Sequence, residues 1–249
     1  MINRVIIITG GGQGIGRKIA IHFLKENWQC AIWEVDKEAG EELAKELNNS
    51  DFFNIHCDVS NEESVKNAVN LTLKKFGRID ILVNNAAISC NKPITELSLI
   101  DWRKVIDVNL TGTFLCSKYC DSELRRNRGA IINICSTRAF QSESNTEAYS
   151  ASKGGVFALT HALAVSLGPE VMVNSISPGW IDQSAEKKHS LAKQELFSEA
   201  DQQQHPAGRI GKTDDIANLV WFLAQHDNNF ITGQNFIIDG GMSSKMIYI

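Results

Sequence analysis

Short runs of β-branched and other apolar residues alternate with helical patterns along this chain of 249 residues. Each run has the length of a buried strand, and the stretches between them repeat apolar residues with a helical period. We interpret as strands residues 5–9, 30–33, 81–83, 130–134, 171–176 and 235–238. Strands joined through helices pair in parallel, because each connection crosses back over the sheet. The pattern therefore predicts an α/β fold, a doubly wound parallel sheet of about seven strands with helices on both faces.

The chain has no sign of a boundary between domains. It contains no linker rich in proline, glycine and serine, no internal repeat and no low-complexity segment, so we expect residues 1–249 to form one domain. The polar stretch 184–207 interrupts the alternation of strands and helices. It is either a mobile cover over a ligand site or an ordinary surface insertion, and the motifs described below favour a substrate-covering insertion.

Composition excludes several classes of partner. The formal net charge of -4 comes from interspersed acidic and basic residues, so we expect no nucleic acid and no anionic membrane as partner. The six cysteines lack Cys-x-x-Cys spacing, which predicts free thiols in a reducing compartment and no metal site. Without a signal-peptide pattern or an apolar stretch of about 18 residues, we expect a cytoplasmic protein.

A glycine-rich turn follows the first predicted strand. Residues 9–16 read Thr-Gly-Gly-Gly-Gln-Gly-Ile-Gly and lead directly into a helical pattern. A turn without side chains lets backbone N–H groups and the helix N-terminus approach a pyrophosphate closely. Such a turn alone is weak evidence, because glycines serve other turns as well. The strand before it, the helix after it and an acidic residue at the end of the second strand together indicate a dinucleotide site.

That acidic residue is Glu34, eighteen positions after Gly16. Its carboxylate can accept hydrogen bonds from both hydroxyls of an adenosine ribose and repels a 2′-phosphate, so NAD is favoured and NADP is disfavoured. Asp36, two residues later, is the rival carboxylate. Arg17 could meet a 2′-phosphate, but beside Glu34 we interpret it as a solvated arginine in the first helical turn.

Tyr149 and Lys153 are four residues apart, a spacing that places both on one face of a helix. An ammonium close to a phenol stabilises the phenolate and lowers the tyrosine pKa from its usual value of about 10. The pair suits proton transfer to or from a hydroxyl or carbonyl. Taken alone, this spacing occurs by chance in many solvated helices.

Together the two motifs resemble those of the classical short-chain dehydrogenase/reductase family, and the similarity extends over essentially the whole chain. Further segments resemble family segments in the same order: Asp58-Val59, Asn-Asn-Ala-Ala at 84–87, Asn-Leu-Thr-Gly at 109–112, Ser136 thirteen residues before Tyr149, Pro178-Gly179, and residues 231–234 and 239–241. The resemblance implies a Rossmann-type fold and an oxidoreductase that uses a nicotinamide cofactor.

The resemblance also implies four catalytic residues. Tyr149 exchanges a proton with the substrate oxygen while hydride passes between substrate carbon and nicotinamide. Lys153 assists the tyrosine and hydrogen-bonds the nicotinamide ribose. Ser136 holds the substrate oxygen, and Asn109 places a water that connects Lys153 to solvent. Structural roles are the alternatives, such as a strand cap for Ser136, but the shared family spacing of all four favours catalysis.

The cofactor contacts implied by the family are numerous. They are Gly10, Gln13, Gly14, Ile15, Gly16, Glu34, Asp58, Val59, Asn85, Ala86, Ala87, Tyr149, Lys153, Pro178, Gly179 and Ile181. Two positions depart from the family pattern. Ala87 replaces a usual glycine, for which we expect a slight local shift. Gln183 stands where the family commonly has a threonine, so its contact with the cofactor is left open.

Substrate choice is expected to depend on residues 89–94, 138–145 and 184–207 with Trp180, because these follow the carboxyl ends of strands. Aromatic residues there indicate an apolar wall, whereas Arg138 and Glu143 indicate a polar or charged substrate. These opposing signals predict a secondary alcohol or ketone without selecting one.

A stripe of small residues follows Tyr149 at positions 151, 155, 158 and 162. It permits close helix contact, which core packing alone could explain. The family resemblance favours a homotetramer, or at least a dimer through this helix.

We therefore predict an NAD(H)-dependent oxidoreductase acting on a small-molecule alcohol or ketone. The alternative enzyme is a reductase of 3-oxoacyl thioesters of the acyl-carrier-protein type, against which stand Glu34 and the lack of a basic cluster beyond Lys187 and Lys188. A non-catalytic NADH-binding regulator is the alternative from another class, and the intact catalytic residues argue against it. Physiological substrate, stereochemistry and direction of reaction are left open.

Overall fold

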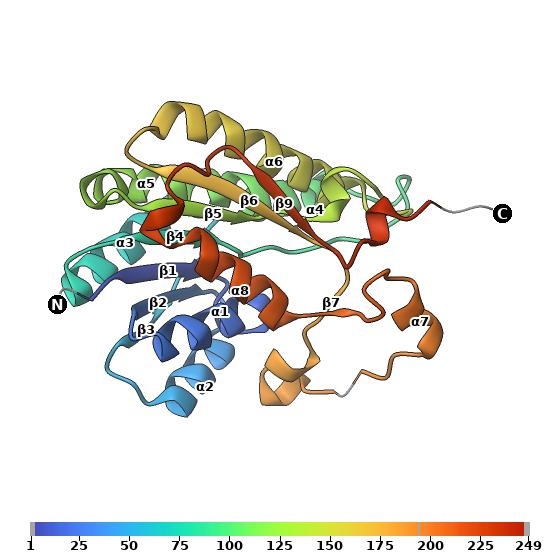
Figure 1. Cartoon of the computed structure of the whole chain (residues 1–249), viewed down its shortest axis with the longest axis horizontal. Helices are drawn as coiled ribbons and strands as arrows, with labels where there is room; N and C mark the ends of the chain where they lie inside the picture. Colours follow the sequence, from blue (N-terminus) through green and yellow to red (C-terminus); the bar gives the residue numbers. More distant parts are fainter. Residues whose placement is uncertain (1–2, 194, 247–249) are drawn as a thin grey trace.

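A seven-stranded parallel sheet forms the centre of the protein in the computed structural model, which describes residues 3–193 and 195–246. Each neighbouring pair of strands is parallel, and the order is β3-β2-β1-β4-β5-β6-β9 (Figure 1). The strands are β1 (Val5–Thr9), β2 (Gln29–Glu34), β3 (Phe52–His56), β4 (Ile81–Asn84), β5 (Ala130–Ile134), β6 (Met172–Pro178) and β9 (Asn235–Ile238). The predicted doubly wound sheet is confirmed, and the six strands expected by range differ at their ends by at most two residues, whereas β3 was not assigned a range.

Helices cover both faces of the sheet. On one face lie α1 (Gly14–Lys25), α2 (Lys37–Leu47) and α8 (Thr213–Leu223). On the other lie α3 (Glu62–Phe76), α5 (Gly112–Asn127) and α6 (Glu147–Leu167). A further helix, α4 (Leu99–Ile106), runs into α5 through a π-helical turn, η1 (Asp107–Thr111), and packs against α6.

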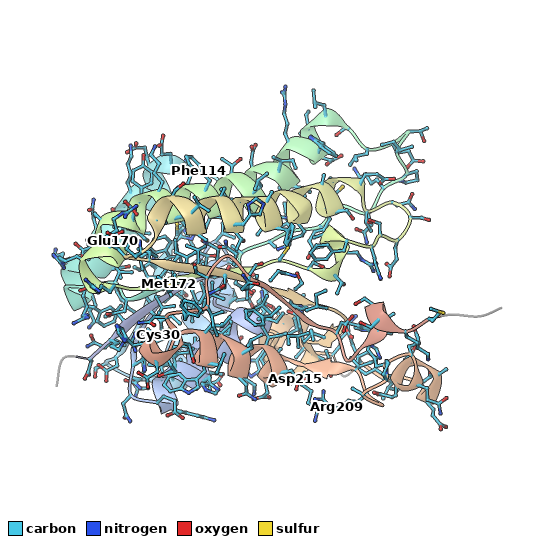
Figure 2. The ribbon with its side chains drawn as sticks, turned by 45° about the horizontal axis from the view of Figure 1, so that its top comes forward. Cys30, Phe114, Glu170, Met172, Arg209 and Asp215 are labelled. Atoms are coloured by element: carbon cyan, nitrogen blue, oxygen red, sulfur yellow. The ribbon has the colours of Figure 1, made fainter. Side chains whose placement is uncertain are left out.

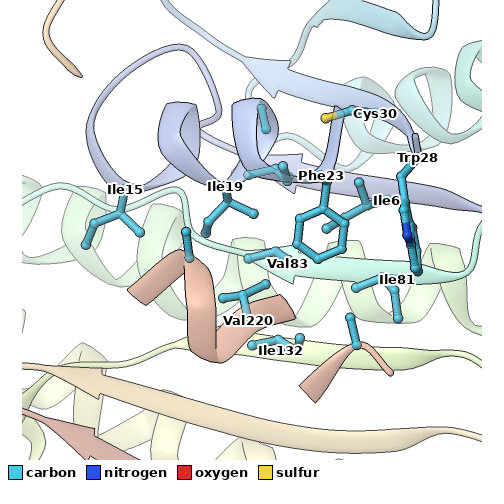
Figure 3. Close-up of a cluster of buried hydrophobic side chains, with 14 of the residues drawn as sticks. Ile6, Ile15, Ile19, Phe23, Trp28, Cys30, Ile81, Val83, Ile132 and Val220 are labelled. Carbon is cyan, nitrogen blue, oxygen red and sulfur yellow. The ribbon is translucent and has the colours of Figure 1, made fainter. Parts of the chain in front are cut away.

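The apolar pattern of β1 follows from this coverage. Ile6 and Ile8 enter the core cluster on the α1 side, and Ile7 enters the cluster on the α5 side. A strand covered on both faces is apolar throughout instead of alternating with polar residues. Figure 3 shows the α1 side, where Phe23 projects from α1 and lies next to Trp28 and Ile6.

The strand order reverses between β1 and β4, which are neighbours although β2 and β3 intervene in the chain. The helices that follow the two strands therefore leave the sheet on opposite faces, and a crevice opens between them at the carboxyl ends of the strands. The predicted glycine turn lies at this point, directly after β1.

The 184–207 stretch leaves the sheet after β6 and returns before α8, on the side where the carboxyl ends of the strands lie (Figure 1). Its described residues form the short turns η3 (Ser184–Glu186) and η4 (His189–Leu191) and a short helix, α7 (Glu199–Gln203). Its two ends are joined by pairing of β7 (Ile181–Asp182) with β8 (Gly211–Lys212). Arg209 Nη1 lies 2.7 Å from Asp215 Oδ2, and this ion pair fixes the return to α8 (Figure 2).

Replacing Phe23 tests how much its ring contributes to the stability of the core on the α1 side. Its ring meets those of Trp28 and Trp221 edge-on, at 5.1 and 5.2 Å between centroids, and it is fully buried. We expect Phe23→Ala to lower the free energy of unfolding by about 3–5 kcal/mol, because it removes the ring and leaves a cavity. Chemical denaturation measures the change, with the fully exposed Phe230 replaced by alanine as the control. Equal effects of the two substitutions would contradict this account.

Candidate functional site

Two chain segments touch where the strand order reverses. The Thr9 hydroxyl accepts hydrogen bonds from the backbone N–H groups of Asn85 and Ala86, both at 3.0 Å. Asn85 Nδ2 in turn donates to the carbonyl oxygens of Thr9 (3.0 Å) and Gly10 (2.9 Å). Gly10 has φ +61°, and a Cβ at this position would lie 2.9 Å from the Ala86 Cα. Only glycine fits this contact without displacing the backbone.

A cleft of about 670 Å³ runs along the carboxyl ends of the strands and collects most of the predicted site residues. Those that line it are Gly10, Gln13, Gly14, Ile15, Glu34, Asn85, Ala86, Ala87, Ser136, Tyr149, Lys153, Pro178, Gly179 and Ile181. A second hollow of about 700 Å³ shares Gly10, Glu34 and residues 86–88 with it and adds Asp58 and Val59. The two hollows adjoin each other through these shared residues.

The turn offers free backbone donors to a ligand in the cleft. Helix α1 begins at Gly14, no acidic side chain lies in its first turn, and its N-cap residue Gln13 makes no side-chain capping bond. The first N–H groups of a helix have no partner within it and attract anions. The described structure therefore fits a pyrophosphate at the start of α1.

Glu34 lies at the end of β2 and is almost fully buried. Its Oε2 accepts a hydrogen bond from Gly12 N at 2.9 Å, and its Oε1 accepts one from Asp36 N at 3.0 Å. A carboxylate has about four acceptor sites. Glu34 therefore keeps acceptor capacity toward the cleft that it lines.

Asp36, the rival carboxylate, has other partners. It caps α2 by accepting from Ala39 N, and it pairs with Lys188 Nζ at 2.8 Å. The hydrogen bond from Lys188 lowers the pKa of Asp36. Arg17 is not the solvated arginine that we expected, because its buried guanidinium pairs with Glu42 and Glu46 on α2.

The other end of the cleft brings three predicted catalytic residues together. Ser136 follows β5, and its Oγ accepts the Arg138 backbone N–H at 3.1 Å, which leaves its own hydrogen to donate to a ligand. Lys153 Nζ donates to the Ile134 carbonyl at 2.7 Å and lies 5.6 Å from the centre of the Tyr149 ring. Lys153 is 3 % exposed, so a main-chain oxygen fixes its position within the core.

Asn109 does not line this cleft. It is buried in η1, where its Nδ2 donates to the Ile88 carbonyl and to Ser152 Oγ, both at 2.9 Å, and its Oδ1 accepts from Ile88 N at 2.8 Å. Ser152 Oγ donates to the Tyr149 carbonyl at 2.7 Å. The side chain thus ties the loop after β4 to α6, and the water that we expect Asn109 to place stays a prediction.

Gly16 also lies behind the wall of the cleft. A Cβ on Gly16 would approach the Gly10 carbonyl oxygen to 2.3 Å and Asn85 Nδ2 to 2.7 Å. This glycine lets α1 pack closely beneath the turn. It supports the cleft without lining it.

The 184–207 segment contacts α2 and the glycine turn through Lys188. Lys188 Nζ lies 2.5 Å from Glu38 Oε2 in addition to its pair with Asp36, and Lys188 N donates to Gln13 Oε1 at 3.2 Å. The hydrogen bond to Asp36 is the main reason why the pKa of Lys188 is raised. Gln183 lines the cleft, and its Oε1 lies 2.1 Å from where a Cβ on Gly14 would be. The sequence offered no signal for the Lys188 contacts, because they join residues about 150 positions apart.

Aromatic and charged groups share the other side of the cleft. Trp180 lies between Phe197 and His205, with ring centroids at 5.8 and 6.1 Å. Arg138 forms an ion pair with Glu143, and both line the cleft. The opposing signals in the sequence thus correspond to groups that line the same cleft.

The cysteines, histidines and carboxylates of the described residues form neither a disulfide nor a metal site. All six cysteines are free, and burial raises the pKa of Cys135, which lies directly before Ser136. Within the described residues no three histidine, cysteine or carboxylate side chains are placed to hold a metal ion. None of the helices described here has the length and apolar character needed to span a membrane.

Asn109→Ala tests whether this residue positions the site. Removing the carboxamide leaves the backbone N–H and C=O of Ile88 without these partners and removes the bond that Ser152 Oγ accepts, so we expect a loss of about 1–3 kcal/mol in the free energy of unfolding. Ser152→Ala removes one bond of the same chain, and in a double-mutant cycle the two losses should not add. Additive losses, measured by chemical denaturation, would show that the two side chains act independently.

Comparison with known proteins agrees with this geometry. A family model described as enoyl-(acyl carrier protein) reductase matches residues 10–243. An uncharacterized oxidoreductase of Thermotoga maritima is 53% identical over 251 residues, which cover 98% of each chain.

Two solved structures are similar throughout. An apo SCOR enzyme from Clostridium thermocellum has a TM-score of 0.90 and 42% identity, with 100% of this chain and 96% of that one covered. ElxO with NADP bound has a TM-score of 0.87 and 34% identity, with 98% and 100% covered. The extent of these matches and the arrangement of Ser136, Tyr149 and Lys153 show that the chain belongs to the short-chain dehydrogenase/reductase family of oxidoreductases.

Proposed function

We propose that this protein is an NAD(H)-dependent oxidoreductase that interconverts a secondary alcohol and a ketone. The observation that carries the proposal is the cleft itself, which has Glu34 toward one end and Ser136, Tyr149 and Lys153 toward the other. A dinucleotide lying along the glycine turn spans that distance, with its reactive ring beside the tyrosine.

The residues of this chain fit a nicotinamide dinucleotide. Gly10, Gly14 and the start of α1 form a cradle of backbone for the pyrophosphate, and Asp58 and Val59 line the hollow for the adenine. The cofactor accepts or donates a hydride at its nicotinamide ring. Ile181 and Pro178-Gly179 line the cleft on the side proposed for that ring.

In this mechanism Tyr149 is the general acid and base. In reduction of a ketone, its hydroxyl donates a proton to the carbonyl oxygen, and in oxidation of an alcohol the phenolate accepts one. Ser136 donates its free hydroxyl hydrogen to the same oxygen and fixes its position. Lys153 supplies a buried positive charge that stabilises the phenolate, and Asn109 positions the helix that carries both residues.

Tyr149→Phe should fold, bind NADH and lose turnover by about 10²–10⁴-fold, because it removes only the transferable proton. Tyr119→Phe is the matched control, since that tyrosine bonds Glu62 at the surface. Steady-state NADH oxidation measures turnover, and NADH fluorescence measures binding. Undiminished turnover in Tyr149→Phe would rule out this mechanism.

The preference for NAD rests on Glu34. Its carboxylate faces the expected ribose position and repels a 2′-phosphate, and Arg17 is held by Glu42 and Glu46 on α2. The relative ElxO binds NADP, so cofactor choice has to be tested directly.

We expect Glu34→Ala to lower the ratio of kcat/KM for NADH over NADPH by about 10- to 100-fold, since hydrogen bonds to charged groups contribute about 1.5–3 kcal/mol. Asp36→Asn is the control, because Asp36 is engaged by Lys188 and the α2 N-terminus. Thermal denaturation checks that Glu34→Ala still folds. An unchanged ratio in a folded variant would assign cofactor choice to other residues.

The covering segment 184–207 belongs to the same proposal. Its contacts with Gln13 and Asp36 support a role in closing the cleft over bound cofactor and substrate.

We also propose that residues 1–249 act as one domain in a cytoplasmic homotetramer. Ala151, Ala158 and Ala162 lie exposed on α6, so packing within one chain does not account for them, and they are free to meet a second copy.

Reduction of a 3-oxoacyl thioester is the second candidate, favoured by a relative from Chlamydia muridarum that is 33% identical over 249 residues and is named 3-oxoacyl-[acyl-carrier-protein] reductase. Against it, Lys188 is occupied by Asp36 and Glu38, which leaves Lys187 alone among the basic residues considered for a carrier dock. A panel of ketones and 3-oxoacyl thioesters, assayed with NADH and NADPH, separates the two. Tight NADH binding without turnover of any compound would instead favour a regulator.

A further inference from the structure

Arg138 is carried by the same turn that presents Ser136. It lies in η2 (Thr137–Ala139), and its backbone N–H donates to Ser136 Oγ. Its side chain lines the main cleft and also an adjoining hollow of about 440 Å³, which it shares with Ser136, Tyr149 and Met242. A guanidinium therefore lies beside the proposed proton donors, next to space that the cofactor contacts do not account for.

The Arg138 guanidinium forms an ion pair through one of its nitrogen atoms. Glu143 pairs with Arg138 Nη2, and the side chains of the two residues are 28% and 70% exposed. A guanidinium has five N–H donors in a planar fork, and it suits a carboxylate with two parallel hydrogen bonds. Glu143 is its one ion-pair partner among the described residues, and Arg138 lines both hollows, so its other N–H donors are available to a ligand there.

The other charged groups around this space are engaged. Lys153 donates to Ile134, and Asp239 accepts from Gly241 N and from Ser243 N and Oγ. Apart from Lys187 at the covering segment, Arg138 is the cation among the described lining residues that is placed to meet a substrate. A single guanidinium that a ligand takes over from Glu143 balances one negative charge, so it suits a monocarboxylate and not a dianionic phosphate.

We propose that Arg138 binds a carboxylate of the substrate, so that the substrate class is an oxo acid and its hydroxy acid. Glu143 is the exchangeable counter-ion that holds the guanidinium in place before the substrate carboxylate arrives. The inference rests on the proposed function, because Tyr149 and Ser136 act on the ketone or hydroxyl of the same molecule.

A purely structural ion pair makes different predictions. If Arg138 and Glu143 only fastened the loop 140–146 to η2, then Arg138→Gln and Glu143→Gln would affect all substrates alike. If Arg138 binds a carboxylate, Arg138→Gln lowers kcat/KM for acids because it removes the binding group. Glu143→Gln raises kcat/KM for acids because it removes the carboxylate that competes with the substrate for Arg138.

The test uses pyruvate, acetoacetate and levulinate, each beside its amide, in NADH oxidation by the full chain. The acid and amide differ mainly in charge, and the series varies the distance from ketone to carboxylate. For at least one pair we expect the acid to have a kcat/KM about tenfold or more above that of the amide. Arg138→Gln should abolish this preference by lowering kcat/KM for the acid about tenfold more than for the amide, and Glu143→Gln should increase the preference. Equal loss for acid and amide, or no preference in the unchanged protein, would overturn the proposal.

Two further measurements separate this inference from the proposed function. Butane-2,3-dione carries no charge, so its turnover tests the oxidoreductase without Arg138. Calorimetric binding of the three acids to the NADH-loaded protein tests the carboxylate site without turnover. Binding that Arg138→Gln removes supports the site even if no ketone is reduced. Turnover of the dione together with absence of acid binding keeps the enzyme and rejects the carboxylate site.

Discussion

The contact between Thr9–Gly10 and Asn85–Ala86 is the constraint on which the site depends. β1 and β4 are neighbours at the point where the strand order reverses, so the turns after them leave in opposite directions and would separate without a bond between them. The Thr9 hydroxyl and the Asn85 carboxamide provide that bond with four hydrogen bonds of 2.9–3.0 Å. Because Gly10 has no side chain, the two backbones approach closely, and one continuous cleft connects Glu34 with Tyr149.

The catalytic side chains gain their order from a second set of buried bonds. Asn109 hydrogen-bonds both Ile88 and Ser152, and Ser152 bonds the Tyr149 carbonyl. These bonds fix the position of α6 relative to the loop after β4. Lys153 is tied instead to the end of β5 through the Ile134 carbonyl. Buried groups that are fully hydrogen-bonded are costly to displace, so the phenol and ammonium need little reorganisation when a ligand binds.

Local patterns in the sequence were sufficient to predict the fold and most of the residues that line the cleft. Strand periodicity, the glycine turn and the Tyr149–Lys153 spacing depend on neighbours in the chain, and the structure has the predicted parallel sheet with these residues at one cleft. The positions of Asn109 and Arg17 depend on partners far away in sequence. A carboxamide can face a ligand or a backbone loop with equal chemistry, and an arginine in a first turn is solvated unless acidic residues of another helix reach it. Only the packing of η1 behind the β4 loop and of α1 against α2 decides these cases.

The covering segment is held by interactions of a weaker kind than the site beneath it. Lys188 reaches Asp36 and Glu38 at the partly exposed rim of the cleft, where solvent and salt still screen the ion pairs and weaken them. The pair lowers the pKa of Asp36, so its stabilising effect is present above the ordinary pKa of this carboxyl and is lost as the pH falls through the lowered value. Around neutral pH the contact is therefore intact. The proposed covering role requires a contact of this kind, because a segment that closes over bound cofactor and substrate has to open again before the product leaves, whereas the buried bonds around Tyr149 fix the catalytic side chains throughout.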